Sequence, residues 1–242
     1  MKKILVVAAH PDDEVLGCGG TIARHREEND EVHVVLMADG VTSRTYNPEN
    51  KQLRSEELKL NKEAIIKRQN EACKANQILG VEQKNIHFLN FPDQRLDSVP
   101  LLDLIKGIEK IKKIVHPEII YTHFFNDLNL DHYLTVRATV TAFRSVLGAK
   151  YFMIYHFEAP ETTSLSILHG AAPFRPNHFV NISKTLEKKI QALQAYESEK
   201  RDYPDLRSVE YIRKHARKRN KGSGSEYAEA FYQFSKKTNL TI

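Results

Sequence analysis

The feature that most constrains the fold is an alternation of short apolar runs with longer stretches of helical periodicity. The apolar runs have the length of buried strands and lie at Ile4–Ala9, Val32–Met37, Ile86–Phe91, Ile119–Thr122 and Tyr151–Phe157. The helical stretches lie at Val15–Glu28, Ser55–Leu79, Pro100–Val115, Tyr133–Leu147, Lys184–Glu199 and Arg207–Gly222. Strands that alternate with helices predict an α/β fold, a Rossmann-like, mainly parallel sheet with helices on both faces.

The length of 242 residues suits one domain. We expect residues 1–150 to form its βαβ core and residues 151–242 a C-terminal extension. No apolar run reaches the ~20 residues that cross a bilayer, and the first run leads into carboxylates rather than a signal-peptide cleavage site. We therefore expect a cytoplasmic protein without a transmembrane segment, in which Cys18 and Cys73 are buried thiols. A homo-oligomer is compatible with the sequence, which does not determine the oligomeric state.

An acidic stretch, His-Pro-Asp-Asp-Glu, follows the first predicted strand. A dinucleotide-binding turn would instead carry G-x-G-x-x-G there, so that backbone amides face a pyrophosphate. In this chain Gly17, Gly19 and Gly20 come later, and Asp12, Asp13 and Glu14 precede them. The pattern argues against a dehydrogenase or a methyltransferase and predicts a site for a cation.

The residue types at this position suit zinc. His10 and Asp13 flank the turn at Pro11, and a catalytic zinc takes three such nitrogen or oxygen ligands and leaves one position for water. Because ligands bind at the carboxyl ends of parallel strands, the third ligand should come from another strand end, where His132 follows Asp131. Singly, the acidic stretch also suits a helix N-cap and His132 a helix start; their joint appearance favours a metal, zinc or iron(II).

Several motifs resemble the PIG-L/LmbE-like zinc-dependent deacetylases, which act on N-acetylglucosaminyl groups. The resembling segments are AHPDDEVLGCGGTIARH (9–25), RQNEACKANQILGV (68–81), FPDQRLD (91–97), DLNLDH (127–132) and AEAF (228–231). The resemblance implies that His10, Asp13 and His132 bind zinc, that Asp12 is the general base, and that Arg68 and Asp93 hold sugar hydroxyls. Without the resemblance, Arg68 and Asp93 would be read as a surface arginine and a turn aspartate.

One position departs from the family pattern. Asn129 stands where many members have a histidine that stabilises the oxyanion or protonates the leaving amine. An asparagine amide donates a hydrogen bond to an oxyanion but cannot protonate an amine. Either Asp12 performs both proton transfers, or another group such as His123 assists; a partly buried strand histidine is an equally good interpretation of His123.

The expected reaction is hydrolysis of an acetamide on an N-acetylglucosamine-type sugar, with Asp12 removing a proton from a zinc-activated water. A zinc amidase of the same fold that cuts a larger N-acyl group or a thiol conjugate is the main alternative. A non-catalytic nucleotide-binding module is disfavoured, because it would have no physical reason to keep His10, Asp12, Asp13 and His132 together.

The net charge of +5 owes much to a basic stretch with Arg213, Lys214, Arg217, Lys218 and Arg219. Such runs usually form solvated faces; a sharper hypothesis is contact with the phosphate of a nucleotide- or lipid-linked sugar. Nucleic-acid binding is disfavoured, because no stacking aromatic residues clearly interleave with these charges. The polar segment Val41–Glu63 is long enough to overhang the site.

Overall fold

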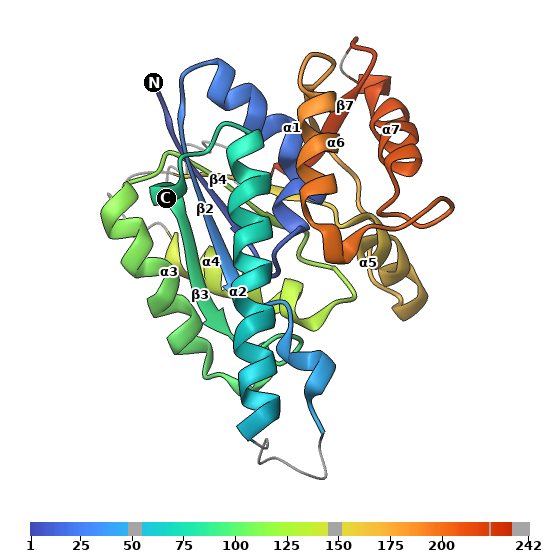
Figure 1. Ribbon diagram of the computed structural model, residues 1–242. Helices are drawn as coiled ribbons and strands as arrows, with labels where there is room; N and C mark the ends of the chain where they lie inside the picture. The colour runs from blue at the N-terminus through green and yellow to red at the C-terminus, as the bar shows by residue number, and fades with distance from the viewer. Residues whose placement is uncertain (48–54, 145–151, 223, 234–242) are drawn as a thin grey trace.

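The computed structural model describes residues 1–47, 55–144, 152–222 and 224–233 (Figure 1). Within these ranges the strands form one seven-stranded sheet of order β3-β2-β1-β4-β5-β7-β6. The strands are β1 (Lys3–Ala8), β2 (Glu31–Ala38), β3 (Ile86–Phe91), β4 (Ile119–His123), β5 (Met153–Phe157), β6 (His178–Asn181) and β7 (Ala228–Gln233). Neighbours from β3 to β5 pair in parallel, and β7 pairs antiparallel with β5 and β6. The predicted mainly parallel α/β fold is confirmed.

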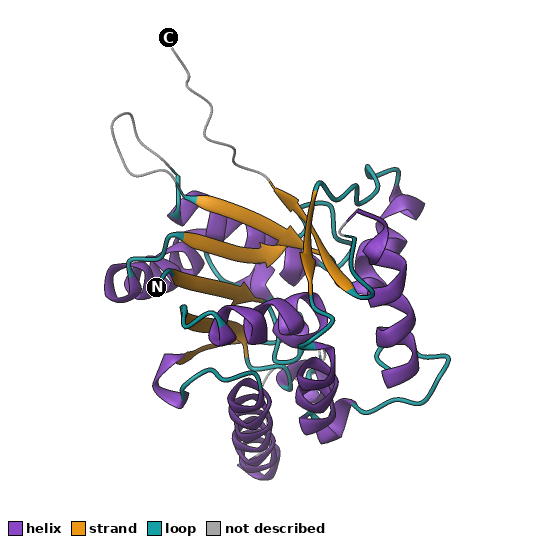
Figure 2. Ribbon diagram, turned by 90° about the horizontal axis from the view of Figure 1, so that it is seen from above, coloured by secondary structure: helices purple, strands orange, loops and turns teal. Residues whose placement is uncertain are grey.

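Helices cover both faces of the sheet, as the view from above shows (Figure 2). They are α1 (Asp13–Glu27), α2 (Ser55–Ile78), α3 (Leu101–Val115), α4 (Leu130–Ala142), α5 (Pro160–Leu165), α6 (Leu186–Ala195) and α7 (Val209–Lys218). Alternate residues of β1 enter opposite cores: Ile4 and Val6 join the side of α1, α2 and α6, whereas Leu5 and Val7 join the side of α3 and α4. No helix in the described part of the chain is both long and apolar enough to span a membrane.

The five predicted strands are present, but β6, β7 and the short α5 were not predicted. The helix predicted to end at Glu199 ends at Ala195, because Tyr196 leaves helical geometry at ψ 73°. The helix predicted from Tyr133 begins three residues earlier. The expected end of that helix and the first residue of the fifth predicted strand fall in residues 145–151, and part of the expected overhanging segment falls in residues 48–54; both ranges lie outside the described residues.

The order of the strands determines where a site can form. The chain lays β2 and β3 on one side of β1 and then returns to place β4 on its other side. Such a reversal leaves a crevice at the carboxyl ends of the two central strands, where ligands bind in open α/β sheets. The acidic stretch follows β1 and the segment 127–132 follows β4, so these predicted site segments meet at the crevice.

The glycines of α1 serve packing rather than nucleotide binding. A Cβ atom on Gly17 would lie 2.2 Å from the ring of Phe157, so only glycine allows this close approach. The helix is kinked at Cys18, and beyond the kink the amides of Gly20 and Thr21 donate to the buried Glu229 carboxylate at 3.0 and 2.7 Å. Strand β7 therefore fixes the helix that begins at the acidic stretch.

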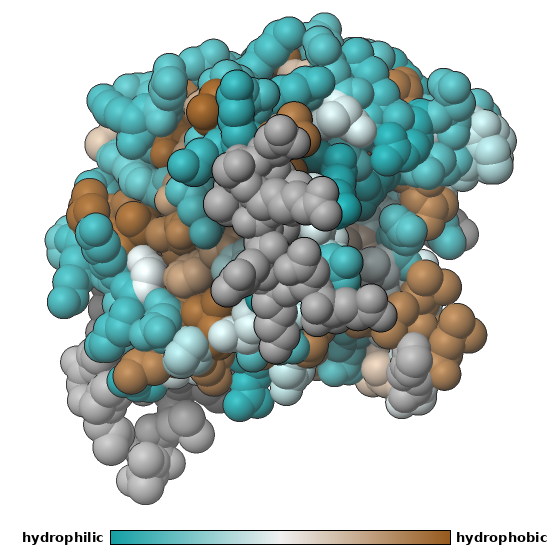
Figure 3. Space-filling model, turned by 60° about the horizontal axis from the view of Figure 1, so that its bottom comes forward, coloured by the Kyte–Doolittle hydropathy of each residue, from teal (hydrophilic) through white to brown (hydrophobic). Residues whose placement is uncertain are grey.

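The surface in Figure 3 is mostly hydrophilic, with hydrophobic residues in separate groups. The exposed hydrophobic residues include Leu165, Ile167 and Leu168 at the end of α5 and just beyond it. These exposed residues do not by themselves indicate a second copy of the chain, and a homo-oligomer stays a prediction. Of the two cysteines, Cys18 is a buried free thiol as expected, whereas Cys73 is a partly exposed one.

Candidate metal centre and adjoining pocket

The three predicted metal ligands meet at the carboxyl ends of β1 and β4. His10 Nδ1 lies 3.2 Å from Asp13 Oδ2, and His132 Nε2 lies 3.3 Å from the same oxygen. All three side chains are buried, and their ligand atoms lie within 4.8 Å of one another. Donor atoms about 3.3 Å apart are what a tetrahedral ion with bonds of roughly 2.0–2.1 Å requires. The donor set therefore fits an ion such as zinc.

A carboxylate holds the second nitrogen of each histidine. His10 Nε2 lies 3.1 Å from Asp131 Oδ2, and His132 Nδ1 lies 3.1 Å from Asp127 Oδ1. Carboxylates in these positions fix the tautomer and orientation of metal-binding histidines. No role was predicted for Asp127 or Asp131; their spacing around His132 in Asp-Leu-Asn-Leu-Asp-His is the signal that could have identified them.

The electrostatic field of the cluster favours positive charge. Burial alone would lower the pKa of His132, but Asp13 and Asp127 raise it to about 9. Burial likewise opposes protonation of His10, yet Asp13 and Asp131 hold its pKa well above the usual range. Buried carboxylates that stabilise positive charge in this way are the surroundings that a bound cation needs.

Asp12, the N-cap residue just before α1, has a strained conformation with φ 118° and ψ −28°. Such geometry costs on the order of 1–3 kcal/mol and is typical of functional sites. It is held by the bond from the Asp12 amide to Glu14 Oε2, at 3.1 Å, and Glu14 in turn accepts from the Tyr196 hydroxyl. Burial raises the pKa of Asp12 to about 7, with Arg207 opposing and Asp13 adding to the rise. Asp12 is thus a carboxyl group able to gain or lose a proton near neutral pH.

A cavity of about 190 Å³ adjoins the cluster, and Asp12 together with the predicted substrate-binding residues Arg68, Asp93 and Asn129 line it. Arg68 is buried, and its Nη1 atom has no hydrogen-bond partner among the described residues. Asp93 Oδ1 lies 3.4 Å from His10 Nε2. The structure therefore brings all seven predicted site residues to one place.

Asn129 has two roles at once. Its Oδ1 caps α4 by accepting from the Asp131 amide at 2.9 Å, which fixes the side chain. Its Nδ2 donates to Gln94 Oε1 at 3.2 Å, and both residues line the cavity. An amide N–H donor therefore lies on the cavity wall, where the resemblance led us to expect one.

His123 does not suit the proton-transfer role considered for it. The side chain is fully buried, and its Nε2 accepts from the Ala9 amide at 2.9 Å. Burial lowers the pKa of His123 to about 3, and its ring stacks on His132 with centroids 3.9 Å apart. Because a neutral imidazole that accepts through Nε2 has no proton there to give, His123 supports the metal cluster by packing instead.

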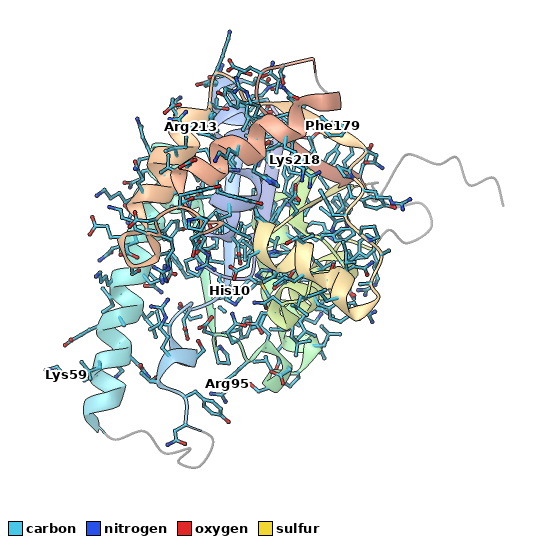
Figure 4. The ribbon with its side chains drawn as sticks, turned by 90° about the vertical axis from the view of Figure 1, so that its right-hand side faces the viewer. His10, Lys59, Arg95, Phe179, Arg213 and Lys218 are labelled. Atoms are coloured by element: carbon cyan, nitrogen blue, oxygen red, sulfur yellow. The ribbon has the colours of Figure 1, made fainter. Side chains whose placement is uncertain are left out.

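Arg213, Lys214 and Arg217 of α7 are paired with acidic residues. Lys214 contacts Glu210 at 2.6 Å, and Arg213 Nη2 contacts Glu187 at 2.7 Å. In Figure 4 Arg213 and Lys218 lie on α7 at the top of the view, away from His10. Among the described residues of α7, none lines the cavity. The geometry favours a solvated face over a phosphate contact at the site.

Four charged residues of the cavity wall were not predicted: the exposed Glu161 of α5, and a connected group of Arg44, Glu199 and Arg207. Arg44 lies in the short helix Thr42–Thr45, Glu199 follows α6, and Arg207 lies in the loop before α7. The Glu199 carboxylate contacts Arg44 and Arg207. Because these residues meet only through the tertiary fold, no local pattern could have identified them.

Comparisons with known proteins agree with this geometry. The family model PIG-L, GlcNAc-PI de-N-acetylase, matches residues 5–143. The chain is 32% identical to the uncharacterized deacetylase YaiS of Escherichia coli K12, over 66% of this chain and 76% of YaiS. It is 27% identical to the diacetylchitobiose deacetylase of Thermococcus kodakarensis, over 95% of this chain and 82% of that enzyme.

A solved structure extends the comparison of folds. The 4-carboxy-2-hydroxymuconate hydratase of Pseudomonas putida KT2440 is 22% identical, with a TM-score of 0.69 over 100% of both chains. At this identity the likeness shows the fold alone. Because that protein is named as a hydratase and not as a deacetylase, the fold by itself does not determine the reaction. The family model, however, covers more than half of the chain, and the chain belongs to the PIG-L family.

Proposed function

We propose that this protein is a metal-dependent hydrolase that removes the acetyl group from an N-acetylglucosamine-type sugar. The observation that carries the proposal is the convergence of His10 Nδ1 and His132 Nε2 on one Asp13 oxygen, at 3.2 and 3.3 Å. Asp12 lines the adjoining cavity. The relatives named as deacetylases, one of them for diacetylchitobiose, support an acetamide on an amino sugar as the substrate.

His10, Asp13 and His132 would hold the ion, with zinc as the first candidate and iron(II) the second. When bound, such an ion polarises the acetamide carbonyl and lowers the pKa of a water molecule. Asp127 and Asp131 contact the other nitrogens of His132 and His10 and would fix the orientation of these two ligands.

Asp12 serves as the general base and then as the general acid. It takes a proton from the attacking water and returns it to the sugar nitrogen as the carbon–nitrogen bond breaks, which yields acetate and a free amine. A carboxyl group whose pKa is about 7 suits both transfers at neutral pH. Asn129 donates from Nδ2 to the developing oxyanion but cannot protonate the amine, and His123 is occupied by the Ala9 amide. Both transfers therefore belong to Asp12.

Arg68 and Asp93 recognise the sugar hydroxyls. Arg68 lines the cavity, and its Nη1 atom makes no hydrogen bond among the described residues, so this guanidinium group is the donor that we assign to the sugar. The Asp93 carboxylate accepts from the hydroxyl of Ser43 and lies beside His10, so it is a fixed acceptor next to the metal cluster. A fixed donor and a fixed acceptor orient the sugar so that its acetamide faces Asp12.

The test combines metal analysis with acetate release. Purified protein is assayed for bound metal and for acetate release from N-acetylglucosamine, diacetylchitobiose and a nucleotide-linked N-acetylglucosamine. The variant Asp12→Asn should keep the metal and lose a factor of about 10²–10⁴ in rate. The matched control is Asp103→Asn, which removes an exposed carboxylate on α3.

Two outcomes contradict the proposal. Protein that binds no metal after zinc is supplied would refute the role of His10, Asp13 and His132. Metal-bound protein that releases no acetate from any sugar would move the assignment to the amidase alternative, which is tested with larger N-acyl substrates.

A further inference from the structure

The cavity beside the metal cluster contains a charged network, and Arg68 is the one member of it to which the proposed function gives a role. The centre of the network is Glu199, whose side chain is 5% exposed. One oxygen of this carboxylate accepts from both Arg44 and Arg68. The other accepts from Arg207 Nη1 at 2.9 Å and lies 3.4 Å from Arg201 Nη2. Four guanidinium groups thus surround one buried carboxylate.

Two arginines of this network, Arg44 and Arg207, are partly exposed and keep hydrogen-bond donors available. A guanidinium group carries five N–H donors. Within the described parts of the chain, Arg44 contacts one carboxylate, that of Glu199, through its Nη2 atom. Arg207 uses Nη1 for Glu199 and lies 3.7 Å from Asp12. The side chains of Arg44 and Arg207 are 52% and 32% exposed, and both line the cavity. Their remaining donors can reach a ligand in it.

The chemistry of these donors selects an anion. The planar fork of arginine matches the oxygens of a carboxylate or phosphate in pairs, and such charge-assisted bonds are about twice as strong as neutral ones. Glu199 holds both guanidinium groups, one on each carboxylate oxygen, and these contacts leave N–H donors unused on Arg44 and Arg207. Asp12 and the exposed Glu161 also lie near Arg207 and oppose an anion there. Among the described residues Arg44 contacts neither of these two, and it is therefore the stronger attachment point.

We propose that Arg44 and Arg207, positioned by Glu199, form an anion subsite, and that the preferred substrate is an amino sugar that also carries a phosphate or carboxylate. The proposal rests on the function proposed above and specifies its substrate class. It places charge recognition at the cavity wall rather than on α7, whose basic residues contact acidic partners outside the cavity. The cavity of about 190 Å³ favours a small molecule over a polymer.

The kinetic test compares matched substrates of the zinc-loaded protein. They are N-acetylglucosamine 1-phosphate, the glycoside of N-acetylglucosamine with a hydroxy acid, and the neutral methyl glycoside. We expect kcat/KM for at least one anionic substrate to exceed that for the methyl glycoside by about 10- to 100-fold, mainly through KM. Which anionic substrate leads distinguishes phosphate from carboxylate.

Two variants locate the effect. Arg44→Gln should bring the ratio of anionic to neutral kcat/KM close to one. Arg201→Gln is the matched control, because Arg201 contacts the same carboxylate but does not line the cavity among the described residues; it should keep the ratio. Equal kcat/KM for all three substrates in the wild type would overturn the proposal. So would a preference that survives in Arg44→Gln, since an anion held by the metal would behave in that way.

A binding measurement separates this proposal from the proposed reaction. Calorimetry with glucosamine 1-phosphate and methyl glucosaminide needs no turnover, so it reports the subsite even if no acetate is released. A phosphate preference that depends on Arg44, with no deacetylation of any substrate, would keep the subsite and refute the reaction. Acetate release without any such preference in kinetics or binding would keep the reaction and refute the subsite.

Discussion

Replacement of Asp131 by asparagine separates metal affinity from the chemical step. In the wild type, Asp131 Oδ2 lies 3.1 Å from His10 Nε2 and Oδ1 accepts from the Leu96 amide at 3.0 Å. An asparagine keeps Oδ1 for Leu96 but turns an N–H donor toward Nε2. His10 then favours the tautomer with its proton on Nδ1, the nitrogen that faces Asp13. That tautomer cannot bind a metal through Nδ1.

The size of the effect follows from the contact that is lost. A hydrogen bond to a charged group contributes about 1.5–3 kcal/mol, and changes of this kind typically weaken metal binding about 10- to 100-fold. Asp93 Oδ1 lies 3.4 Å from the same nitrogen and can take over part of the role. We therefore expect the lower end of the range, close to a tenfold rise in the Kd for zinc, measured by competition with a chromophoric chelator.

The activity of Asp131→Asn should recover when zinc is saturating, because Asp131 does not line the cavity among the described residues. The control is Asp97→Asn, an exposed carboxylate in the neighbouring short helix Leu96–Ser98, which should leave the Kd unchanged. A Kd within twofold of the wild type would refute the tautomer argument. Activity that saturating zinc does not restore would show instead that Asp131 acts in the reaction.

Three further predictions concern stability. Gly17→Ala places a Cβ 2.2 Å from the Phe157 ring and should lower the free energy of unfolding by about 1–3 kcal/mol in urea titration; Gly19→Ala, whose nearest contact is 3.3 Å away, should cost clearly less. Zinc at 100 times its Kd should stabilise the protein by about 2.7 kcal/mol in thermal melts, reversibly with a chelator; an unchanged Tm would contradict a bound ion. Burial would raise the pKa of Glu158, but His215 and Arg219 outweigh it and lower the pKa. Its stabilisation is therefore present above the ordinary glutamate pKa, about 4.3, and is lost as the pH falls through the lower folded value; Glu158→Gln should flatten the fall in unfolding free energy between about pH 5 and 3.

Periodicity predicted the parallel part of the sheet because its central strands β1, β2 and β4 are nearly continuous buried runs. Strand β6 has four residues, too few for a pattern to emerge, and β7 contains the charged Glu229 in a buried position. That charge is acceptable only because Lys189, 40 residues away, contacts it at 2.6 Å. Pairings of this kind are set by tertiary structure, so local propensity cannot reveal them.

The candidate site divides in the same way. His10, Asp12 and Asp13 are neighbours in the sequence, and the topology of a parallel sheet sufficed to bring His132 to them. The strained backbone of Asp12 was not predicted, because it depends on Glu14 being held by Tyr196, a residue beyond α6. Glu199 lies beyond α6 as well, and the charges that surround it come from separate segments, so its setting has no signature in the local sequence.

The bonds from α1 to Glu229 also have a consequence for the order in which the protein matures. A chain leaves the ribosome from its N-terminus at about 5–20 residues per second. Gly20 is therefore made well before Glu229, its hydrogen-bond acceptor 209 residues later. Until β7 joins the sheet, the helix that begins with Asp13 lacks this support. We therefore expect the cell to load metal into the finished protein rather than into the growing chain.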